Sequence, residues 1–351
     1  MRNYPEGEWP DEELQAIPAC PLCSETRRRL LYEGIGDTLR MCAPGRWTLF
    51  TCLRCGSAYL DPQPKADYIG KAYKAFYTHT APEAYNAAWG GYGNRISRYL
   101  HKDYYNARYG YHLKHALFPG RYLVARSATE KADVDFEMRV HCPFAGARLL
   151  DVGCGNGSFL LTAKYLGWDT MGIEVDPSAV AIAQKADLSV QMGTLETALL
   201  APASFDVITI CHVIEHLHDP VKAIQHMYAL LKPGGQLWLA TPNLEGAGHK
   251  KFGRDWIHLD PPRHLILFTP DSINKALTQA GFTIAEERGV PHARHHYPIS
   301  WAIHEGLDPL SPDVWRQAPA AIQEAAKSAD YLFSTTPRQS DEYVVIAYKQ
   351  V

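Results

Sequence analysis

Apolar runs and amphipathic segments alternate along the chain from residue 147 onward. Short apolar runs that end at glycine or polar residues are typical of buried parallel strands, whereas apolar positions three and four apart indicate helices. The expected strands are ARLLDVG, WDTMGIEV, LSVQMGT, FDVITICHV, GQLWLATP, FTIAEERGV and DEYVVIAYKQV. The expected helices between them are GSFLLTAKYLG, DPSAVAIAQKA, VKAIQHMYALLKPGG and DSINKALTQAGF. Lys232, Pro233 and Gly234 mark the end of the third helix. This alternation predicts an α/β fold with a doubly wound, Rossmann-like sheet of seven strands.

The pattern changes twice before that point, which divides the chain into three parts. Residues 1–65 carry two cysteine pairs and are expected to form a small zinc-ribbon module. Residues 66–145 are rich in tyrosine, and the spacing in KAYKAFYTH and NRISRYLHKDYYNARYGYHLKH predicts a helical segment interrupted by WGGYGN. These tyrosines are expected to pack, with a lid or a substrate-binding wall as the alternative. Residues 146–351 form the α/β domain, with an insertion at about 291–340 that contains a helix at PAAIQEAAKSADYLF.

Composition narrows the class of protein. The 351 residues are 46% hydrophobic, which is enough for a sizeable core, and the formal net charge of -3 argues against a general nucleic-acid binder. No apolar run is long enough to cross a bilayer, and the first residues, MRNYPEGEWPDEELQ, do not resemble a secretion signal. We therefore expect a cytoplasmic protein without a membrane span, and leave its oligomeric state open.

The cysteine pairs have the spacing of metal knuckles. Cys20 and Cys23 form one C-x-x-C, and Cys52 and Cys55 form a second. Four thiolates placed in this way bind zinc tetrahedrally and leave no open position, so we expect a structural zinc site. A redox-active pair or unrelated thiols are the alternatives, although no βαβ pattern of the thioredoxin type lies nearby.

A glycine loop, DVGCGNGSF, directly follows the first expected strand of the α/β domain. Gly153, Gly155 and Gly157 let a ligand approach the backbone at the start of the next helix. Their G-x-G-x-G spacing differs from the dinucleotide fingerprint G-x-G-x-x-G. Asp151, just before the loop, suits a ligand with an ammonium group, and Glu174 ends the next strand, where an acid binds ribose hydroxyls. A purely structural turn would need neither acid.

With these residues, the sequence resembles the class I S-adenosylmethionine-dependent methyltransferases. LLDVGCGNGSF and GIEVDPSAV are similar to the first two motifs of that family. FDVITICHVIEHLHDP, LKPGGQLWLATPN and WIHLDPPRHLILFT resemble a bacterial subgroup related to the ubiquinone O-methyltransferases. The cysteine ribbon and the tyrosine-rich segment also look like the front half of many polysaccharide-cluster members of that subgroup.

The resemblance implies a set of cofactor contacts. It places the three loop glycines near the methionine part of S-adenosylmethionine, Asp151 near its amino group and Glu174 on its ribose. The resemblance also implies that the edge of the adenosine site is lined by Val175 and Asp176, and that the adenine is bracketed by Thr194, Leu195 and Glu196. The end of the fourth strand, which faces the transferable methyl group, carries Cys211 and His212.

Histidines supply the candidate bases for a hydroxyl acceptor, because their pKa lies near neutrality. We favour His264 as the general base and His216 next. For each, the alternative is a histidine that fixes a loop by hydrogen bonds. Glu215 and His216 are also candidate metal ligands, as related quinone O-methyltransferases suggest, and His292, His295 and His296 form a further group in a segment expected to be irregular.

The sequence therefore predicts methyl transfer from S-adenosylmethionine to a small molecule or glycan precursor, with oxygen favoured over nitrogen or carbon. One alternative is an RNA methyltransferase in which the zinc ribbon and Arg27–Arg29 grip the substrate, although the net charge disfavours nucleic acid as a partner. The other is a non-catalytic scaffold that binds S-adenosylmethionine. The acceptor and its reacting atom are left open.

Overall fold

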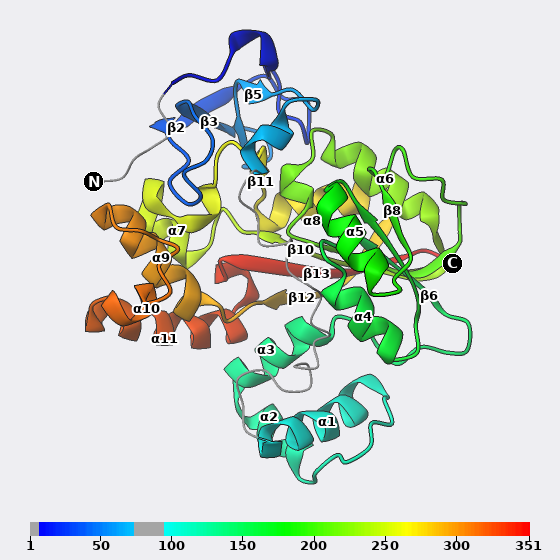
Figure 1. The fold of residues 1–351 in the computed structure, drawn as a ribbon. Helices are drawn as coiled ribbons and strands as arrows, with labels where there is room; N and C mark the ends of the chain where they lie inside the picture. The colour runs from blue at the N-terminus through cyan, green and yellow to red at the C-terminus, as the bar shows by residue number, and fades with distance from the viewer. Residues whose placement is uncertain (1–6, 74–94) are drawn as a thin grey trace.

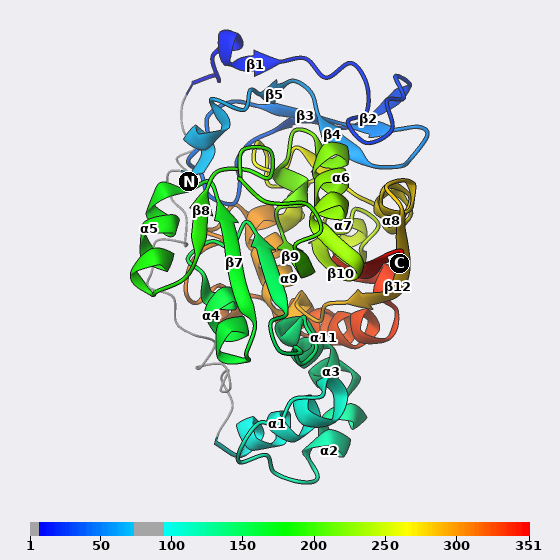
Figure 2. The ribbon, with the colours of Figure 1, turned by 90° about the vertical axis from the view of Figure 1, so that its right-hand side faces the viewer.

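The structure is a computed structural model that describes residues 7–73 and 95–351. Most of the expected segment KAYKAFYTH, and all of WGGYGN, lie outside the described residues. The tyrosine-rich segment that follows forms α1, α2 and α3, which lie on the opposite side of the molecule from the N-terminal strands in Figures 1 and 2. These helices span Arg95–Tyr109, Gly120–Arg126 and Ala128–Met138.

The largest sheet in the described part of the chain has seven strands. In their order across the sheet they are β12 (Phe282–Gly289), β13 (Glu342–Lys349), β10 (Leu231–Pro242), β9 (Phe205–Cys211), β6 (Arg148–Val152), β7 (Asp169–Glu174) and β8 (Val190–Met192). Strands β10, β9, β6, β7 and β8 run parallel, whereas β13 is antiparallel to both of its neighbours. The predicted seven-stranded α/β sheet is confirmed, and the reversed β13 makes it mixed.

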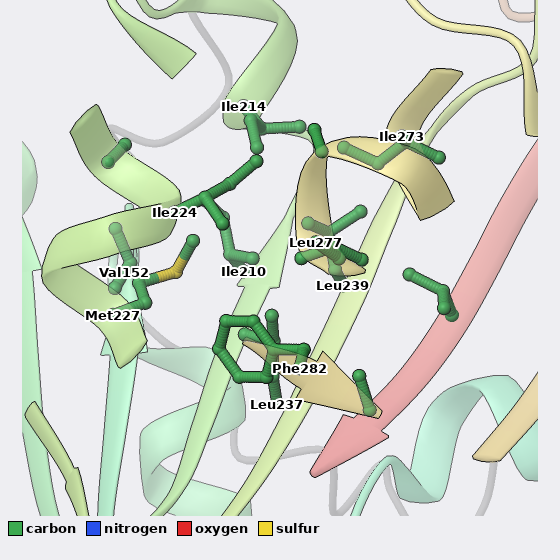
Figure 3. Close-up of a cluster of buried hydrophobic side chains, with 14 of the residues drawn as sticks. Val152, Ile210, Ile214, Ile224, Met227, Leu237, Leu239, Ile273, Leu277 and Phe282 are labelled. Atoms are coloured by element: carbon green, nitrogen blue, oxygen red, sulfur yellow. The ribbon is translucent and has the colours of Figure 1, made fainter. Parts of the chain in front are cut away.

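Helices cover both faces of this sheet because apolar side chains alternate along its strands. In β6, Leu149 and Leu150 are both buried but belong to separate hydrophobic clusters on opposite faces. The helices of the two faces are α4 (Ser158–Tyr165) and α5 (Pro177–Lys185) on one side, and α6 (Pro220–Leu230) and α8 (Pro270–Gln279) on the other. Figure 3 shows the second face, where Ile224 of α6 lies near Ile210 and Leu277 of α8 lies near Leu239, all in one hydrophobic cluster.

Helix α6 ends close to the position that the sequence indicates. Lys232, Pro233 and Gly234 are expected to mark its end, and α6 ends at Leu230, with β10 beginning at the next residue. Leu231 pairs with Phe205 of β9, and the register then shifts before Gln236. The strand therefore begins before the expected GQLWLATP, and a strand irregularity accommodates Pro233 and the two glycines after it.

The cysteine-bearing N-terminal part forms a four-stranded sheet that borrows its last strand from the distant α/β domain. The sheet contains β2 (Arg28–Ile35), β3 (Trp47–Cys52), β4 (Ala58–Leu60) and β11 (Ile266–Leu267), with β11 antiparallel to β4. The amide of Leu60 also donates to the carbonyl of Leu265, 3.0 Å away. The N-terminal sheet is therefore built into the domain, although the boundary at residue 65 stays a prediction.

The expected insertion contains three helices, which lie side by side in Figure 1. They are α9 (Ala293–Glu305), α10 (Val314–Gln317) and α11 (Ala320–Thr335). The segment around His292–His296 is thus largely helical, contrary to prediction, because Pro298 within α9 disguises the helical pattern. The described residues also form a pair of short strands, β1 (Leu14–Gln15) with β5 (Gln63–Pro64), and helix α7 (Ala247–Phe252). No described helix has both the length and the apolar character that a membrane crossing requires.

Candidate functional site

The glycine loop connects β6 to α4 at the carboxyl edge of the large sheet. All three glycines have positive φ values, +70° at Gly153, +55° at Gly155 and +86° at Gly157. Residues other than glycine rarely adopt such values. A Cβ atom at Gly153 would lie 2.3 Å from a methyl group of Val213. The loop thus requires glycine at residue 153 for both its backbone conformation and its close packing.

Glu174 fastens the glycine loop to the end of β7. Its Oε2 accepts a hydrogen bond from the amide of Gly155 at 2.8 Å. Its Oε1 accepts from the amides of Val175 and Asp176 at 2.8 and 3.0 Å. Since a carboxylate oxygen has two lone pairs, Oε2 keeps one of them for a further donor.

Asp151 lies below the loop, in the middle of the sheet, where only 4% of the residue is exposed. Thr209 of β9 donates a hydrogen bond to its Oδ1 at 2.6 Å, and a guanidinium nitrogen of Arg139 lies 4.0 Å from the same oxygen. Burial raises the pKa of Asp151 to about 6, although Arg139 and the hydrogen bond from Thr209 oppose the shift.

Arg139 is a candidate site residue that the sequence did not reveal. It follows α3 with a positive φ of +53°. Its guanidinium lies over the rings of Phe159 and Trp238, 4.3 and 5.0 Å from their centroids. Its Nε is buried and has no hydrogen-bond partner among the described residues. A half-buried cation with an unused donor beside the glycine loop is suited to an anionic ligand group.

The remaining residues expected around the cofactor surround the same edge of the sheet. Val175 is exposed, and the Asp176 carboxylate caps α5 by accepting from the amide of Ser178 at 2.8 Å. In the loop after β8, Leu195 is buried, while the residues on either side of it, Thr194 and Glu196, are exposed. Cys211 ends β9, and His212 follows it. These positions are adjacent along the carboxyl edge, where open α/β sheets bind ligands.

His212 links two buried carboxylates at this edge. Its Nε2 lies 2.7 Å from Glu342, and its Nδ1 lies 3.3 Å from Glu215. Burial opposes the charged form of His212, but these carboxylates outweigh it and hold its pKa well above the ordinary value. Glu215 also accepts from the hydroxyl of Thr241 at 3.0 Å. The end of β9 is therefore an ionic network rather than an apolar wall.

The two candidate bases, His264 and His216, are brought together beside Glu215. Their ring centroids are 4.7 Å apart, edge to face. The Nδ1 of His264 lies 2.7 Å from the carbonyl of His258, and the Nδ1 of His216 lies 2.9 Å from that of Arg263. Because a carbonyl only accepts, Nδ1 carries the proton in each ring. Each neutral ring then has an unprotonated Nε2. Burial, followed by the nearby His216, lowers the pKa of His264 to about 4.

The same neighbourhood offers ligands for a cation. One ligand atom from each of Glu215, His216 and His264 lies within 4.8 Å of the others. The sequence suggested Glu215 and His216 as ligands without a third, and His264 supplies it from a segment 48 residues further along. The other histidine group does not assemble as expected, because His295 is exposed, while His292 binds the carboxylate of Glu342 at 2.7 Å.

The four knuckle cysteines converge on one point of the N-terminal sheet. Cys20 and Cys55 have sulfur atoms 3.6 Å apart, and those of Cys23 and Cys52 are 3.5 Å apart. All four ligand atoms lie within 4.8 Å of one another. Four sulfurs at about 2.3 Å from a single zinc ion would be roughly 3.8 Å apart. The donor type and spacing therefore fit a tetrahedral zinc site.

Two of the three arginines between the knuckles, Arg27 and Arg28, are engaged by carboxylates. Arg27 binds Glu25 through two nitrogens at 3.0 Å, and Arg28 binds Asp61 at 2.5 Å while lying over the ring of Phe50. These contacts hold the edge of the N-terminal sheet together. They leave less positive charge for an RNA backbone than the sequence alone implies.

Comparison with known proteins places these features in a family. The model of a methyltransferase domain matches residues 128–287. A ubiquinone biosynthesis O-methyltransferase from Pseudomonas fluorescens is 30% identical over 171 residues, which cover 44% of this chain and 74% of that protein. A protein of the same description from Cereibacter sphaeroides is 29% identical over 186 residues, which cover 49% of this chain and 72% of that protein.

Solved structures are similar at a lower level. An S-adenosylmethionine-dependent methyltransferase from Mesorhizobium loti is 15% identical, with a TM-score of 0.42, over 64% of this chain and all of that one. The N-terminal cysteine cluster lies before the residues that the methyltransferase family model matches.

Proposed function

We propose, from the premise that this chain belongs to the S-adenosylmethionine-dependent methyltransferases, that it methylates an oxygen atom of a small molecule or glycan precursor. The observation that carries the proposal is the arrangement of the glycine loop, Asp151 and Glu174 beside the histidines that follow β9. The choice of oxygen is supported by the relatives described as ubiquinone biosynthesis O-methyltransferases.

The charged and polar groups of the cofactor match hydrogen-bond donors and acceptors at the carboxyl edge of the large sheet. Asp151 would hold the ammonium of the methionine part, and the unpartnered Nε of Arg139 would hold its carboxylate. The spare lone pair of Glu174 would accept from a ribose hydroxyl. Leu195, between Thr194 and Glu196, would cover the adenine. When bound, S-adenosylmethionine supplies a methyl group that its positive sulfur already activates.

The chain's own task is then to position the acceptor and remove its proton. Holding an acceptor oxygen in line with the methyl group can contribute an effective molarity of about 10⁵–10⁸ M. The unprotonated Nε2 of His264 or His216 would accept the hydroxyl proton, a role worth about 10²–10⁴-fold in rate. We propose that His264 is the general base. If His264 only fixes its loop by hydrogen bonds, the neighbouring His216 is the base.

The cysteine cluster would bind one structural zinc ion. Its support is the set of four sulfur ligands with tetrahedral spacing. The chain next to the N-terminal sheet lies directly against the proposed acceptor site. Tyr73, at the end of the 3-10 turn Ile69–Tyr73, is 3.2 Å from the Nδ1 of His216, and His218 binds the carbonyl of Pro64 in β5 at 2.8 Å. The zinc site would therefore stabilise one wall of the acceptor pocket.

Two experiments test the proposal. Calorimetry should show S-adenosylmethionine binding that Glu174→Ala weakens, while Glu245→Ala, an exposed glutamate, leaves it unchanged. The holoenzyme should then transfer a methyl group to at least one member of a panel of phenols, catechols and sugar nucleotides, with the new O-methyl group located by NMR. His264→Gln should lower kcat while leaving cofactor affinity intact. Absence of cofactor binding would overturn the proposal, and methylation of nitrogen or carbon would overturn the assignment to oxygen.

A further inference from the structure

A second group of buried ligands lies beside the network at the end of β9. His258, His296 and Glu342, which we call the inner cluster, come from a 3-10 turn (Ile257–Leu259), helix α9 and the first residue of β13. One ligand atom of each lies within 4.8 Å of the others. His258 and Glu342 are buried, and His296 is half-buried. The reverse direction of β13 brings Glu342 to the carboxyl edge of the sheet, where the other two residues meet it.

The spacing inside the inner cluster fits a shared ion. The Nε2 of His258 and the Nδ1 of His296 are 3.3 Å apart. Two imidazoles bound to one tetrahedral ion at about 2.0–2.1 Å would have their nitrogens roughly 3.3–3.4 Å apart. In addition, the ring planes are nearly perpendicular, at 87°, so the nitrogens approach from different directions.

The surroundings of Glu342 resemble those of a metal-binding carboxylate. Its two oxygens are held by His212 and His292, each at 2.7 Å, so the carboxylate has a fixed orientation. His292 is itself 3.6 Å from the carboxylate of Asp133. Hydrogen-bonded neighbours of this kind orient the groups that bind a metal. The alternative to a metal ion is a hydrogen bond in which one proton lies between the two imidazole nitrogens of the inner cluster. That alternative does not explain why the oriented carboxylate of Glu342 lies beside them.

We propose that the inner cluster binds one divalent first-row transition-metal ion through two imidazole nitrogens and one carboxylate oxygen. Two histidines and one carboxylate are a donor set suited to zinc or iron(II), and three protein ligands leave positions open for water or a ligand oxygen. The ring of His258 stacks parallel to that of His212, at 6.3 Å, so the ion would border the proposed acceptor site. The site does not depend on which acceptor the enzyme methylates.

Two other groups could bind metals, so the test must separate three sites. The four-cysteine cluster supplies only sulfur, and the group of Glu215, His216 and His264 shares no ligand with the inner cluster. Cobalt(II) distinguishes the first of these, because thiolate ligands give intense charge-transfer bands that nitrogen and oxygen ligands do not. Variants distinguish the second.

The experiment uses the full chain, stripped with a chelator and given one zinc ion per chain to fill the cysteine cluster. Cobalt(II) is then titrated and followed by its visible spectrum and by elemental analysis. We expect uptake without thiolate bands, and loss of that uptake in both His296→Gln and Glu342→Gln. His292→Gln should weaken it by about 10–100-fold, as expected for a residue that orients a ligand. His295→Gln, the exposed neighbour on the same helix, is the matched control and should bind cobalt normally.

Several results would overturn the inner-cluster site. The first is that no cobalt binds outside the four-cysteine cluster. The second is that cobalt uptake persists in both His296→Gln and Glu342→Gln. The third is that uptake is lost in His216→Gln but retained in His296→Gln. Circular dichroism and S-adenosylmethionine affinity identify any variant that has simply unfolded, and Glu342→Gln, which preserves side-chain shape, decides if His296→Gln does not fold. Failure here leaves cofactor binding and methyl transfer untouched, so it is distinguishable from failure of the proposed function.

Discussion

Arg263 and Asp37 form an ion pair that is fully shielded from solvent where the N-terminal sheet meets the segment preceding β11. The guanidinium also binds Asp260 through two nitrogens and the carbonyl of Ala72 at 3.0 Å. The Arg263 side chain thus holds the turn that contains Asp37 against its own loop, which contains Asp260. The two parts behave as one unit in packing, whatever their boundary in sequence.

Removing this arginine should destabilise the whole chain. Arg263→Met would leave the carboxylates of Asp37 and Asp260 buried without a cation, at a cost of about 3–5 kcal/mol in unfolding free energy. Urea denaturation measures the loss. The matched control is Arg316→Met, because Arg316 pairs with Asp313 at the surface and exposed pairs contribute only about 0–1 kcal/mol. Equal losses in the two variants would show that the buried pair has no special role.

The glycine loop should tolerate no side chain at residue 153. Gly153→Ala adds a methyl group 2.3 Å from Val213 in a backbone conformation that costs alanine about 1–2 kcal/mol. We expect S-adenosylmethionine affinity to fall at least tenfold by calorimetry. Adding Val213→Ala should recover part of the loss. Gly146→Ala separates the two effects, since Gly146 has a φ of +79° and open space around it. If Gly146→Ala is as harmful to cofactor affinity, the steric explanation fails.

Cofactor affinity should depend on pH through Asp151. Its raised pKa of about 6 means that the free protein holds a proton there below pH 6, whereas the cofactor's ammonium requires the ionised form. Binding therefore weakens as pH falls, by about tenfold per unit well below pH 6, and releases a proton near that pH. Asp151→Asn should bind weakly at pH 8 and lose this pH step. Calorimetry in buffers of different ionisation enthalpy detects the proton. An unchanged pH profile in Asp151→Asn would assign the step to another group.

The effect of pH on the stability of the folded protein has the opposite sign to its effect on cofactor affinity. A carboxyl group whose pKa is higher in the folded state stabilises the fold below its ordinary pKa, and this contribution is lost as pH rises through about 6. S-adenosylmethionine should therefore raise the melting temperature more at pH 8 than at pH 5. Thermal melts with and without the cofactor test this, and Asp151→Asn should remove the difference.

Loss of a knuckle cysteine should release zinc and loosen the proposed acceptor wall. Cys52→Ser removes one of four sulfur ligands, and we expect the zinc content to fall by about one ion per chain. Hydrogen exchange should increase in β3 and β4 and also in β11, which pairs with β4. Cys142→Ser is the control, because Cys142 is exposed and is not one of the four clustered cysteines. Unchanged zinc content in Cys52→Ser would rule out the four-cysteine site.

The sequence by itself determined the large sheet and the positions around its glycine loop. Alternating apolar runs predicted all seven strands, and Asp151, Glu174 and the loop glycines are close together because they lie at the carboxyl ends of two neighbouring parallel strands, β6 and β7. Local pattern suffices there, since a strand, its turn and the next helix are consecutive in the chain. It did not indicate that β10 begins directly after α6, because the pairing of Leu231 with β9 is a contact between residues distant in the chain.

Only the tertiary structure decided which distant residues meet. Arg139, Tyr73 and Glu342 carry no spacing signal, and they reach the carboxyl edge from a helix end, from the N-terminal part and from the antiparallel last strand. The same folding makes Ile266 and Leu267 the final strand of the N-terminal sheet and joins His296 to His258. The physical reason is that burial and charge pairing act between surfaces built from residues distant in the chain, and local sequence pattern does not specify which of these surfaces meet.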